Sequence, residues 1–496
     1  MVISPVQYIA IPLIAAFLIP LFGKLNKELV RIIPGLVLLY LSYISVVLMN
    51  QVISQNTMIV EIIAGWRPPW GINLVFSPFS GFLASLFSML GFIIWMYTYN
   101  FKREVEDAQT EKFYVLMMML ITGTIGIVLT GDIFNMFVFL EITAISAYSL
   151  TAFYRERDGA EAAFKYLLVG SFASFFILLA IVLLYSQVGT LNMADIAQKM
   201  PDVNPYMKGV ILMLFFVGFG IEAEMFPLNG WAPDVYTQAP GPIGAIFAGM
   251  VVKAGIYGLV RVIFTLFDVH EIFPLLMIMG VITMAVSEVI ALRQGKLKRM
   301  LAYSSIGQMG LVLVAFGIGT HEAVFAAIFL MFNHAVIKSL LFLSGTYLVY
   351  HSKEKNISDL DGIGKSLPFT SFLFALGSLA IVGLPPFAGF WSKLYILMAA
   401  ADVRLIAVIA IILAVSVVEI VYYFRVLHRI YFRERISTIE IKIPSFNAKI
   451  SMLILAIVII VIGVYPDLIS GLIERAATDL LDKQHYIQSV LSVGLH

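Results

Sequence analysis

Residues 220–234 read Gly-Ile-Glu-Ala-Glu-Met-Phe-Pro-Leu-Asn-Gly-Trp-Ala-Pro-Asp and follow the apolar run 210–219. Two acids, Glu222 and Glu224, therefore stand at the end of a lipid-like segment, just before Pro227. Ionisable residues at membrane depth are energetically expensive and usually functional. Backbone freed by proline is tolerated at that depth only where it is buried in protein or lines a wet cavity. The stretch therefore predicts a broken helix beside an ion path.

The composition is that of an integral membrane protein. Of the 496 residues, 60% are hydrophobic and 13% are charged, whereas soluble domains carry about 25% charged residues. The net charge of +1 gives no reason to expect a nucleic-acid partner. The chain has no cysteine, so it can hold no iron–sulfur cluster or haem thiolate and no disulfide. The first apolar run lacks a basic segment before it, which favours a span over a signal peptide.

About fourteen apolar runs are long enough to cross a bilayer as helices, which takes about 20 residues. They are residues 5–22, 29–50, 74–99, 113–130, 132–154, 162–185, 207–226, 243–267, 272–292, 300–318, 322–350, 369–400, 404–431 and 448–470. Residues 227–242 are too short and too rich in Pro and Gly for a further crossing. We expect them to continue the broken seventh span as a re-entrant segment.

Basic residues are distributed unevenly between the loops. The ninth loop, for example, holds Arg293, Lys296, Lys298 and Arg299, and the other odd-numbered loops are also basic. The even-numbered loops hold little beyond Arg67, Lys199, Lys208 and Arg404. Because basic loops stay in the cytoplasm, we expect a multi-pass protein of the cell membrane with both termini on the outer face. No loop is long enough for a soluble catalytic domain. The amphipathic tail 471–496 is expected to lie along the membrane surface.

A second proline break stands in the twelfth span, at Pro385 and Pro386. It comes five spans after the break at Pro227, and an odd offset gives the two broken spans opposite directions through the membrane. Paired discontinuous helices in inverted repeats mark the transport site of many transporters. The alternative is that Pro and Gly are simply common in membrane helices.

Ionisable residues recur inside the predicted spans. Glu141 lies well inside the fifth span, Lys253 well inside the eighth, and Lys165 near the start of the sixth. A charge at the middle of a membrane helix costs about 2.5–3.5 kcal/mol on insertion scales, so such side chains tend to face the protein interior and to pair. The alternatives are an acid that holds two helices together and lysines that snorkel to the interface.

The eleventh span carries His334 and Lys338, which share a helix face because they are four residues apart. An imidazole between lysines suits a proton relay, although a lone buried histidine is also a common packing residue. Lys393 follows the second break and is either a path residue or a snorkelling lysine at a helix end. These residues predict a relay that continues into the second half of the chain.

Four further acids are given less central roles. Glu288 and Glu419 lie towards the ends of their spans, so we expect them at the interface. Asp132 is expected to cap the helix that follows it, and Asp234 belongs to the re-entrant segment.

There is no P-loop, no dinucleotide-binding glycine motif and no histidine spacing for a metal or haem. We therefore expect an ion conductor with no cofactor, no bound metal and no redox chemistry of its own.

At these residues the chain resembles the antiporter-like subunits shared by respiratory complex I, Mrp-type cation/proton antiporters and group 4 membrane-bound hydrogenases. The matching segments are 131–141, 161–166, 226–234, 298–308, 333–342 and 383–393. The resemblance implies an all-α membrane protein of about fourteen helices, with two inverted five-helix repeats and two discontinuous helices. It implies four segments, namely three helices at 1–110, a first repeat at 111–267, a second repeat at 268–432, and a C-terminal helix with a surface tail at 433–496.

The resemblance also implies a proton path through the membrane centre, with Glu141, Lys253, His334, Lys338 and Lys393 at the family's positions. It implies other membrane subunits as partners, peripheral redox subunits as indirect partners, and protons or sodium ions as the moving species. The leading hypothesis is a proton-translocating subunit of a hydrogenase or ferredoxin-linked complex. The second is a Mrp-type Na+/H+ antiporter subunit, and the third is a structural subunit with an inactive channel.

One position departs from the family pattern. A lysine usually precedes the Phe-Pro break in complex I and Mrp members and pairs with the glutamate of the fifth helix. Here Glu222 stands at that position, with Glu224 beside it. Opposed acids repel each other unless one stays protonated, so we include both acids in the path and expect Lys253 or Lys165 to supply the missing positive charge. The Glu-x-Glu form resembles the hydrogenase-like branch more than a typical Mrp subunit.

Overall fold

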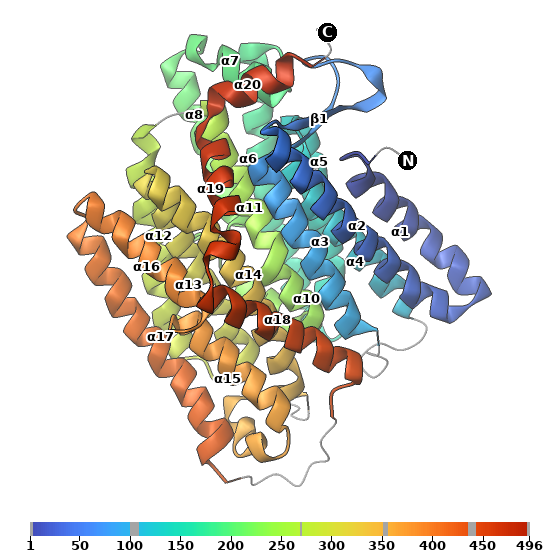
Figure 1. Ribbon diagram of the computed structural model, residues 1–496, viewed down its shortest axis with the longest axis vertical. Coiled ribbons are helices and arrows are strands. Elements are labelled where there is room, and N and C mark those ends of the chain that lie inside the picture. The colour runs from blue at the N-terminus through green and yellow to red at the C-terminus, as the bar shows by residue number, and fades with distance from the viewer. Residues whose placement is uncertain (1–2, 100–108, 268–269, 351–355, 435–442, 494–496) are drawn as a thin grey trace.

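The computed structural model is a bundle of long helices with one small β-hairpin (Figure 1). It describes residues 3–99, 109–267, 270–350, 356–434 and 443–493. Thirteen helices within these residues are long and apolar enough to cross a membrane. Two shorter helices, α15 (Pro368–Val382) and α16 (Ala388–Asp402), share one further crossing around the second proline break. The prediction of an all-α integral membrane protein with about fourteen spans is therefore confirmed.

The crossings overlap the predicted runs one by one. In chain order, the other crossings are α1 (Gln7–Leu25), α2 (Lys27–Gln55), α3 (Pro78–Thr98), α4 (Thr110–Leu129), α5 (Ile133–Thr151), α6 (Arg157–Val188), α8 (Pro205–Glu222), a composite helix at 241–267, α12 (Phe273–Leu292), α13 (Leu297–Ile318), α14 (His321–Val349), α17 (Ile406–Phe432) and α18 (Phe446–Val464). The shorter elements used below are β1 (Ile59–Ile62), its antiparallel partner β2 (Asn73–Phe76), α7 (Met193–Lys199), α9 (Ala232–Gln238), α19 (Asp467–Leu481) and α20 (Lys483–Leu491).

Helix ends are shifted from the predicted runs by a few residues because local capping decides where a helix begins. Asp132 caps α5, as predicted, since its Oδ1 accepts a hydrogen bond from the Asn135 N–H at 2.7 Å. Ser77 caps α3 through the Ser80 N–H, so this helix starts after β2 and not at residue 74.

Contacts between loops agree with the predicted alternation of the spans. Lys165 near the start of α6 and Arg299 near the start of α13 both bind Asp234 in α9. The loops numbered five, seven and nine therefore meet at one end of the bundle. At the other end, Asp479 of α19 binds Ser77 before α3, and Arg475 binds the end of α2. A missed or added span would have placed some of these contacting loops at opposite ends of the bundle. Which end faces the cytoplasm stays a prediction.

The C-terminal helix α19 lies across the ends of other helices. It packs against α3 and α14, with Ile473, Ala477 and Leu480 buried and Glu474 exposed. The apolar side of the predicted tail therefore contacts protein. The position of its other side at the membrane surface stays a prediction, as do the four segment boundaries, and residues 435–442 and 494–496 of the last segment lie outside the described residues.

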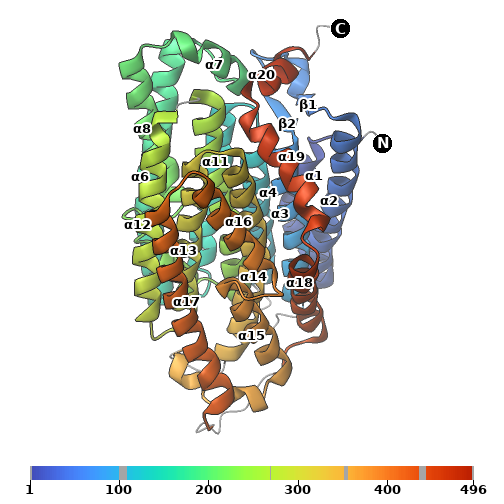
Figure 2. The same cartoon turned by 60° about the vertical axis from the view of Figure 1, so that its left-hand side comes forward.

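The two proline breaks share one backbone arrangement. The paired hydrogen bonds are Met225 N–H to Gly220 O and Glu224 N–H to Ile221 O in the first break, and Leu384 N–H to Leu379 O and Gly383 N–H to Ala380 O in the second. These crossed bonds form the Schellman motif, which requires left-handed backbone at one residue. That residue is Glu224 (φ 57°) in the first break and Gly383 (φ 91°) in the second, and a proline follows three residues later in both. The helices that end there, α8 and α15, reach the middle of the bundle from opposite ends (Figures 1 and 2).

Candidate ion path

Three carboxylates, here called the acid cluster, lie together in the first half of the chain. Glu141 is half-buried in α5 and accepts a hydrogen bond from Ser174 Oγ of α6. Glu222 and Glu224, at the end of α8, are 7% and 2% exposed. Glu222 lies within electrostatic reach of both other acids. Because Glu222 Oε1 and Glu224 Oε2 have no hydrogen-bond partner among the described residues, each of these groups needs a proton, a cation or water to offset its burial.

Glu224 occupies a backbone position that favours glycine. Left-handed backbone costs an ordinary residue roughly 1–2 kcal/mol, and the matching position in the second break is Gly383. The Tyr236 hydroxyl of α9 lies close to the Glu224 carboxyl without completing a hydrogen bond to it. An acid that is strained, buried and incompletely bonded indicates a functional role for its carboxyl group.

Among the described residues, no lysine forms a direct ion pair with the acid cluster, although Glu224 lies within electrostatic reach of Lys253. Lys165 has a side chain that is 46% exposed, and it binds Glu161 at 2.8 Å and Asp234 at 3.0 Å. It therefore lies outside the buried path, because the start of α6 is at the surface of the bundle. Lys253 is fully buried, but its Nζ bonds to the Ala248 carbonyl and to His334. The acid cluster thus has Lys253 as an electrostatic neighbour but not as a hydrogen-bonded partner.

Lys253, His334 and Lys338 form a group that we call the buried line, in which His334 contacts Lys253 and lies within electrostatic reach of Lys338. The Lys253 Nζ meets His334 Nδ1, and His334 Nε2 lies 3.2 Å from Ser305 Oγ. The Lys338 Nζ donates to Tyr423 Oη at 3.1 Å. All three members are 0% exposed. A histidine with a partner on each ring nitrogen can take up a proton on one side and release one on the other, which a packing residue has no need to do.

Lys253 lies beside an irregular stretch of the eighth crossing. This crossing is composite, with α10 (Gly241–Ile246), a π-helical turn at 247–251, α11 (Val252–Val260) and a second π-helical turn at 261–267. The Ala248 carbonyl that binds Lys253 Nζ belongs to the first π-turn. Such turns are rare and are frequent at functional sites, so the backbone here accommodates a buried ammonium group.

A buried ion pair lies beyond the buried line, next to the second break. Lys393 of α16 binds Glu419 of α17 at 2.5 Å, with side chains 10% and 2% exposed. The Gln308 side chain donates to the other carboxyl oxygen at 2.8 Å, and Lys393 also donates to the Val382 carbonyl at the end of α15. Lys393 therefore points into the protein and does not snorkel.

The expectation that Glu288 and Glu419 lie at the interface is wrong, because each is 1% exposed. Glu288 Oε2 accepts a 2.7 Å hydrogen bond from Tyr422. Their helices, α12 and α17, pack against each other, so positions near the ends of apolar runs are still covered by protein. The usable signal was an acid inside an apolar run, as in Val-Ser-Glu-Val-Ile at 286–290 and Val-Val-Glu-Ile-Val at 417–421.

Residues 130–419 match the family described as "NADH:quinone oxidoreductase/Mrp antiporter, TM". This segment covers more than half of the 496 residues. The chain belongs to this family. The predicted resemblance to antiporter-like subunits is confirmed, and the acid cluster, the buried line and the Lys393–Glu419 pair all involve residues within the matching segment.

Two relatives and one solved structure illustrate the range of this antiporter family. The chain is 32% identical over 434 residues to a subunit of the NADH-quinone oxidoreductase of Desulforudis audaxviator, covering 84% of this chain and 86% of that protein. It is 30% identical over 494 residues to a subunit of an Na(+)/H(+) antiporter of Alkalihalophilus pseudofirmus, covering 97% and 98%. A chain of the membrane-bound sulfane sulfur reductase, an archaeal respiratory membrane complex, has a TM-score of 0.92 at 40% identity, covering 98% and 100%.

This antiporter-family chain also carries a charged surface pocket of about 320 Å³ at one end of the bundle. Asp234 is one of its lining residues and is bound by Lys165 and Arg299. Partial burial alone would raise the pKa of the Asp234 carboxyl. The hydrogen bonds and positive charges of Lys165 and Arg299 have a larger effect in the opposite direction, so the pKa lies below the ordinary value of 3.8. The pairs connect the starts of α6 and α13 to the segment that follows the first break.

The Asp234→Asn variant should lose the stability that these ion pairs supply. Each exposed pair contributes about 0.2–1 kcal/mol, so we expect a loss of about 1 kcal/mol near pH 7. Because the folded pKa lies below the unfolded one, this contribution is present above about pH 4 and is lost as the pH falls through the folded value. Thermal melting of both proteins should show a difference at pH 7 that shrinks towards pH 3, whereas a difference constant with pH would contradict the assignment.

Proposed function

We propose that this chain moves protons through the buried line as an antiporter-like membrane subunit of a multisubunit energy-converting complex. The observation that carries the proposal is the contact between Lys253 of the eighth crossing and His334 of α14. It joins the two predicted repeats through a pair of titratable groups that no solvent reaches. The proposed path runs through Glu141, Glu222, Glu224, Lys253, His334, Lys338, Glu419 and Lys393, whereas Lys165, at the surface, is left out of it.

Movement of a proton along this path would change the charge balance of its neighbours. Glu224 lies within electrostatic reach of Lys253 and Lys338, and two unit charges 4 Å apart interact by about 4 kcal/mol at an effective dielectric constant of 20. Protonation of the acid cluster removes negative charge near Lys253, so its ammonium group is less stabilised and donates a proton to His334 Nδ1. Lys338 is the next acceptor, and its charge acts on Glu419 and Lys393.

The acid cluster would replace the Glu–Lys pair of other members with carboxyl groups that share protons. Two neighbouring carboxylates disfavour each other's charge, so one of them holds a proton more tightly. A partner's reaction that shifts this balance would then drive protons through the buried line. The hydrogenase or respiratory branch is supported by the 40% identity to a chain of the archaeal sulfane sulfur reductase complex.

We further propose that the partners are other membrane subunits, with peripheral redox subunits acting indirectly, and that the complex lies in the cell membrane with both termini of this chain outside. A second candidate function is that of a Mrp-type Na+/H+ antiporter subunit. It is favoured by the 30% identity to an Na+/H+ antiporter subunit over 97% of this chain.

Proton movement in vesicles that contain the whole complex separates these two functions. We expect internal acidification, followed with a pH-sensitive dye, when the complex turns over its redox substrates in sodium-free buffer. Transport that requires sodium, or that exchanges 22Na+ for protons without a redox substrate, would instead support the antiporter function.

The Glu222→Gln variant tests whether the acid cluster conducts. Glutamine keeps the size of the side chain but cannot bind and release a proton, so pumping should fall at least about tenfold, equivalent to about 1.4 kcal/mol in the barrier. The control is Glu322→Gln at the exposed start of α14, which should pump normally. Normal assembly with normal pumping in Glu222→Gln would favour the third hypothesis, a structural subunit with an inactive channel.

A further inference from the structure

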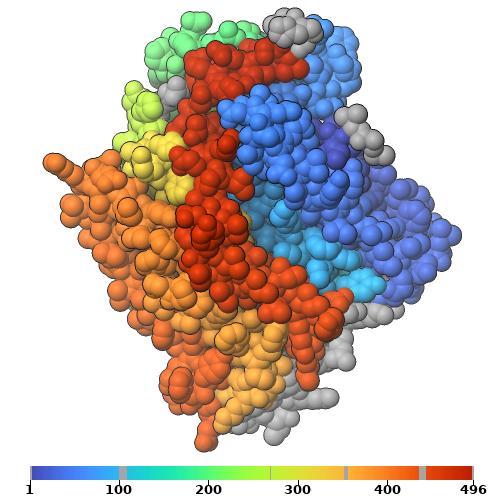
Figure 3. All heavy atoms as spheres, viewed as in Figure 1, coloured from blue at the N-terminus to red at the C-terminus, as the bar shows by residue number. Residues whose placement is uncertain are grey.

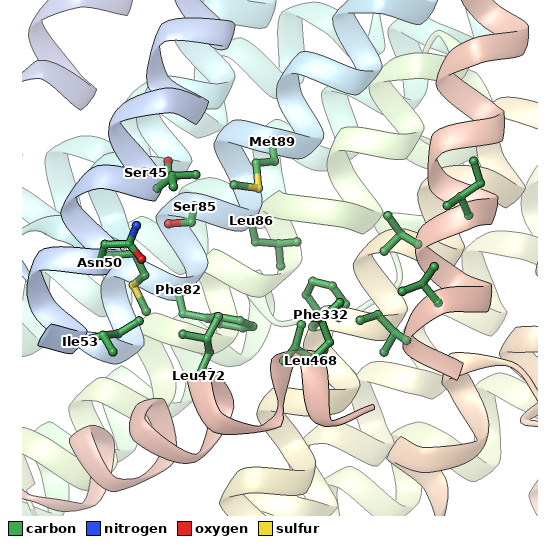
Figure 4. Close-up of a pocket in the computed structure, with 17 residues that line it drawn as sticks. Ser45, Asn50, Ile53, Phe82, Ser85, Leu86, Met89, Phe332, Leu468 and Leu472 are labelled. Carbon is green, nitrogen blue, oxygen red and sulfur yellow. The ribbon is translucent and has the colours of Figure 1, made fainter. Parts of the chain in front are cut away.

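A lateral groove opens on one face of the bundle between α2, α3, α18 and α19. Figure 3 shows this face hollowed between the blue N-terminal helices and the red C-terminal ones. Its volume is about 540 Å³, within the range of roughly 300–1,000 Å³ that is typical of ligand sites. Phe82 of α3 and Phe332 of α14 line it, with ring centroids 6.1 Å apart (Figure 4).

The walls of the groove offer little to a polar ligand. Leu86 and Met89 of α3 face Leu472 of α19 and apolar residues of α18 (Figure 4). Two serines line it, but both hydroxyls are already bonded inside the protein. Ser45 donates to the Leu41 carbonyl and Ser85 to the Gly81 carbonyl. An occupant of the groove is therefore apolar, because a polar group there would lose its hydrogen bonds to water without replacement.

The length of the groove matches one leaflet of a bilayer. The α2 residues that line it run from Ser45 to Ile53, and the helix ends at Gln55. At 1.5 Å per residue, this stretch reaches about 15 Å inward from the helix end. The hydrocarbon core of a bilayer is about 30 Å thick, so the groove extends from one membrane surface to about the midplane.

The helix α19 closes the groove at its surface end. Arg475 Nη1 of α19 donates to the Ile53 carbonyl at 3.3 Å and to Asn56 Oδ1 at 3.2 Å. Asp479 accepts from Ser77 Oγ at 2.6 Å, so α19 is attached to the ends of both α2 and α3. A straight membrane-spanning helix of a neighbouring subunit could not pass this end, whereas a flexible chain that stops at the surface fits beneath it.

Polar groups with free hydrogen-bonding capacity occur only near this end of the groove, within the described residues that line or border it. Both hydrogen bonds of the Arg475 side chain use Nη1, so its Nε and Nη2 can bind an anion. Asn50 lines the groove less than two turns before the end of α2, is exposed, and has no hydrogen-bond partner among the described residues. The neighbouring Glu474 lies 3.5 Å from His321 on the α14 side, so within the described part of the chain the guanidinium of Arg475 has no carboxylate partner.

We propose that this groove binds one phospholipid of the leaflet on the α19 side. An acyl chain lies along Leu86 and Met89, the phosphate accepts hydrogen bonds from Arg475, and the amide of Asn50 reaches the ester groups. Guanidinium groups are well suited to phosphate oxygens, and the order of apolar wall, amide and guanidinium towards the surface follows the order of groups in a phospholipid. The bound lipid fills the space between α2–α3 and α18–α19.

The proposal can be tested on the whole complex washed in mild detergent and measured by native mass spectrometry. We expect one retained phospholipid per copy of this chain. Ser85→Trp places an indole in the groove and should lower retention at least tenfold. The matched control is Ser171→Trp on the exposed face of α6, where the serine also donates to the carbonyl four residues earlier. Equal retention in the two variants would overturn the proposal.

A photoreactive lipid keeps the test valid if Ser85→Trp does not assemble. Phosphatidylglycerol and phosphatidylethanolamine with a diazirine at mid-chain should label residues 82–89 of the washed wild-type complex, whereas a diazirine diacylglycerol, which has no phosphate, should label them at least tenfold less. Arg475→Gln should reduce phospholipid labelling and Arg475→Lys should retain most of it. Labelling spread evenly over α6 and α3, or a cross-link from residue 89 to a neighbouring subunit, would show that another occupant covers the groove.

Discussion

Replacement of Lys253 by methionine should abolish proton pumping by the assembled complex. Methionine fills nearly the same volume but carries no proton, and it leaves His334 Nδ1 without the ammonium group that contacts it. Because Lys253 is fully buried, bulk water does not reach this point to replace the missing donor. We expect the rate of acidification in vesicles to fall at least about 100-fold, equivalent to about 2.7 kcal/mol in the barrier.

The matched control is Lys27→Met, at the exposed start of α2, which should pump at the normal rate. Native gel electrophoresis should show that the Lys253→Met complex still assembles, since a neutral apolar side chain is tolerated in a buried site more easily than a charge. Normal pumping by an assembled Lys253→Met complex would exclude the proposed path through the buried line.

The sequence allowed the crossings to be predicted because the bilayer imposes a length and a polarity on every span. The alternation of basic loops then constrained the number of spans, and the contacts of Asp234 with Lys165 and Arg299 agree with that number. Helix ends were less predictable because they depend on single capping residues such as Asp132. The shared geometry of Glu224 and Gly383 also depends on backbone dihedral angles, which the sequence does not specify for a glutamate.

The candidate site was predicted where an isolated charge interrupts an apolar run. This signal marked Glu141, Lys253 and Lys338, but the same signal at Glu288 and Glu419 was discounted because these acids stand near the ends of their runs. Depth counted along one helix says nothing of the neighbouring helices that cover its end.

Several neighbours of the buried line and of the Lys393–Glu419 pair could not have been predicted. Ser305, Gln308 and Tyr423 are ordinary residues for a membrane helix, and only the packing of α13, α14 and α17 brings them next to His334, Glu419 and Lys338. The partner of Lys165 could not be predicted either, because Asp234 lies in a distant loop. Pairing of charges is a tertiary property, so the sequence indicates the candidates and not the pairs.

The Lys393–Glu419 pair should behave as one unit in stability. Removing one member of a buried ion pair leaves an uncompensated charge and costs about 3–5 kcal/mol, whereas replacing both with apolar residues is often neutral or stabilising. We therefore expect Glu419→Leu and Lys393→Met each to destabilise the protein by about 3–5 kcal/mol. The double variant should recover most of this loss, and all three should fail to pump because no titratable group remains paired at the second break.

A double-mutant cycle from denaturant unfolding in detergent micelles measures this coupling. The surface pair Arg429–Asp361, with side chains 34% and 19% exposed, provides the comparison, since exposed pairs contribute only about 0.2–1 kcal/mol. Losses that simply add in the Lys393→Met/Glu419→Leu protein would mean that the two side chains are not electrostatically coupled. A double variant that is stable and assembled but does not pump would have an intact bundle whose second half lacks both charges. Such a result would separate the role of the pair in proton movement from its role in the fold.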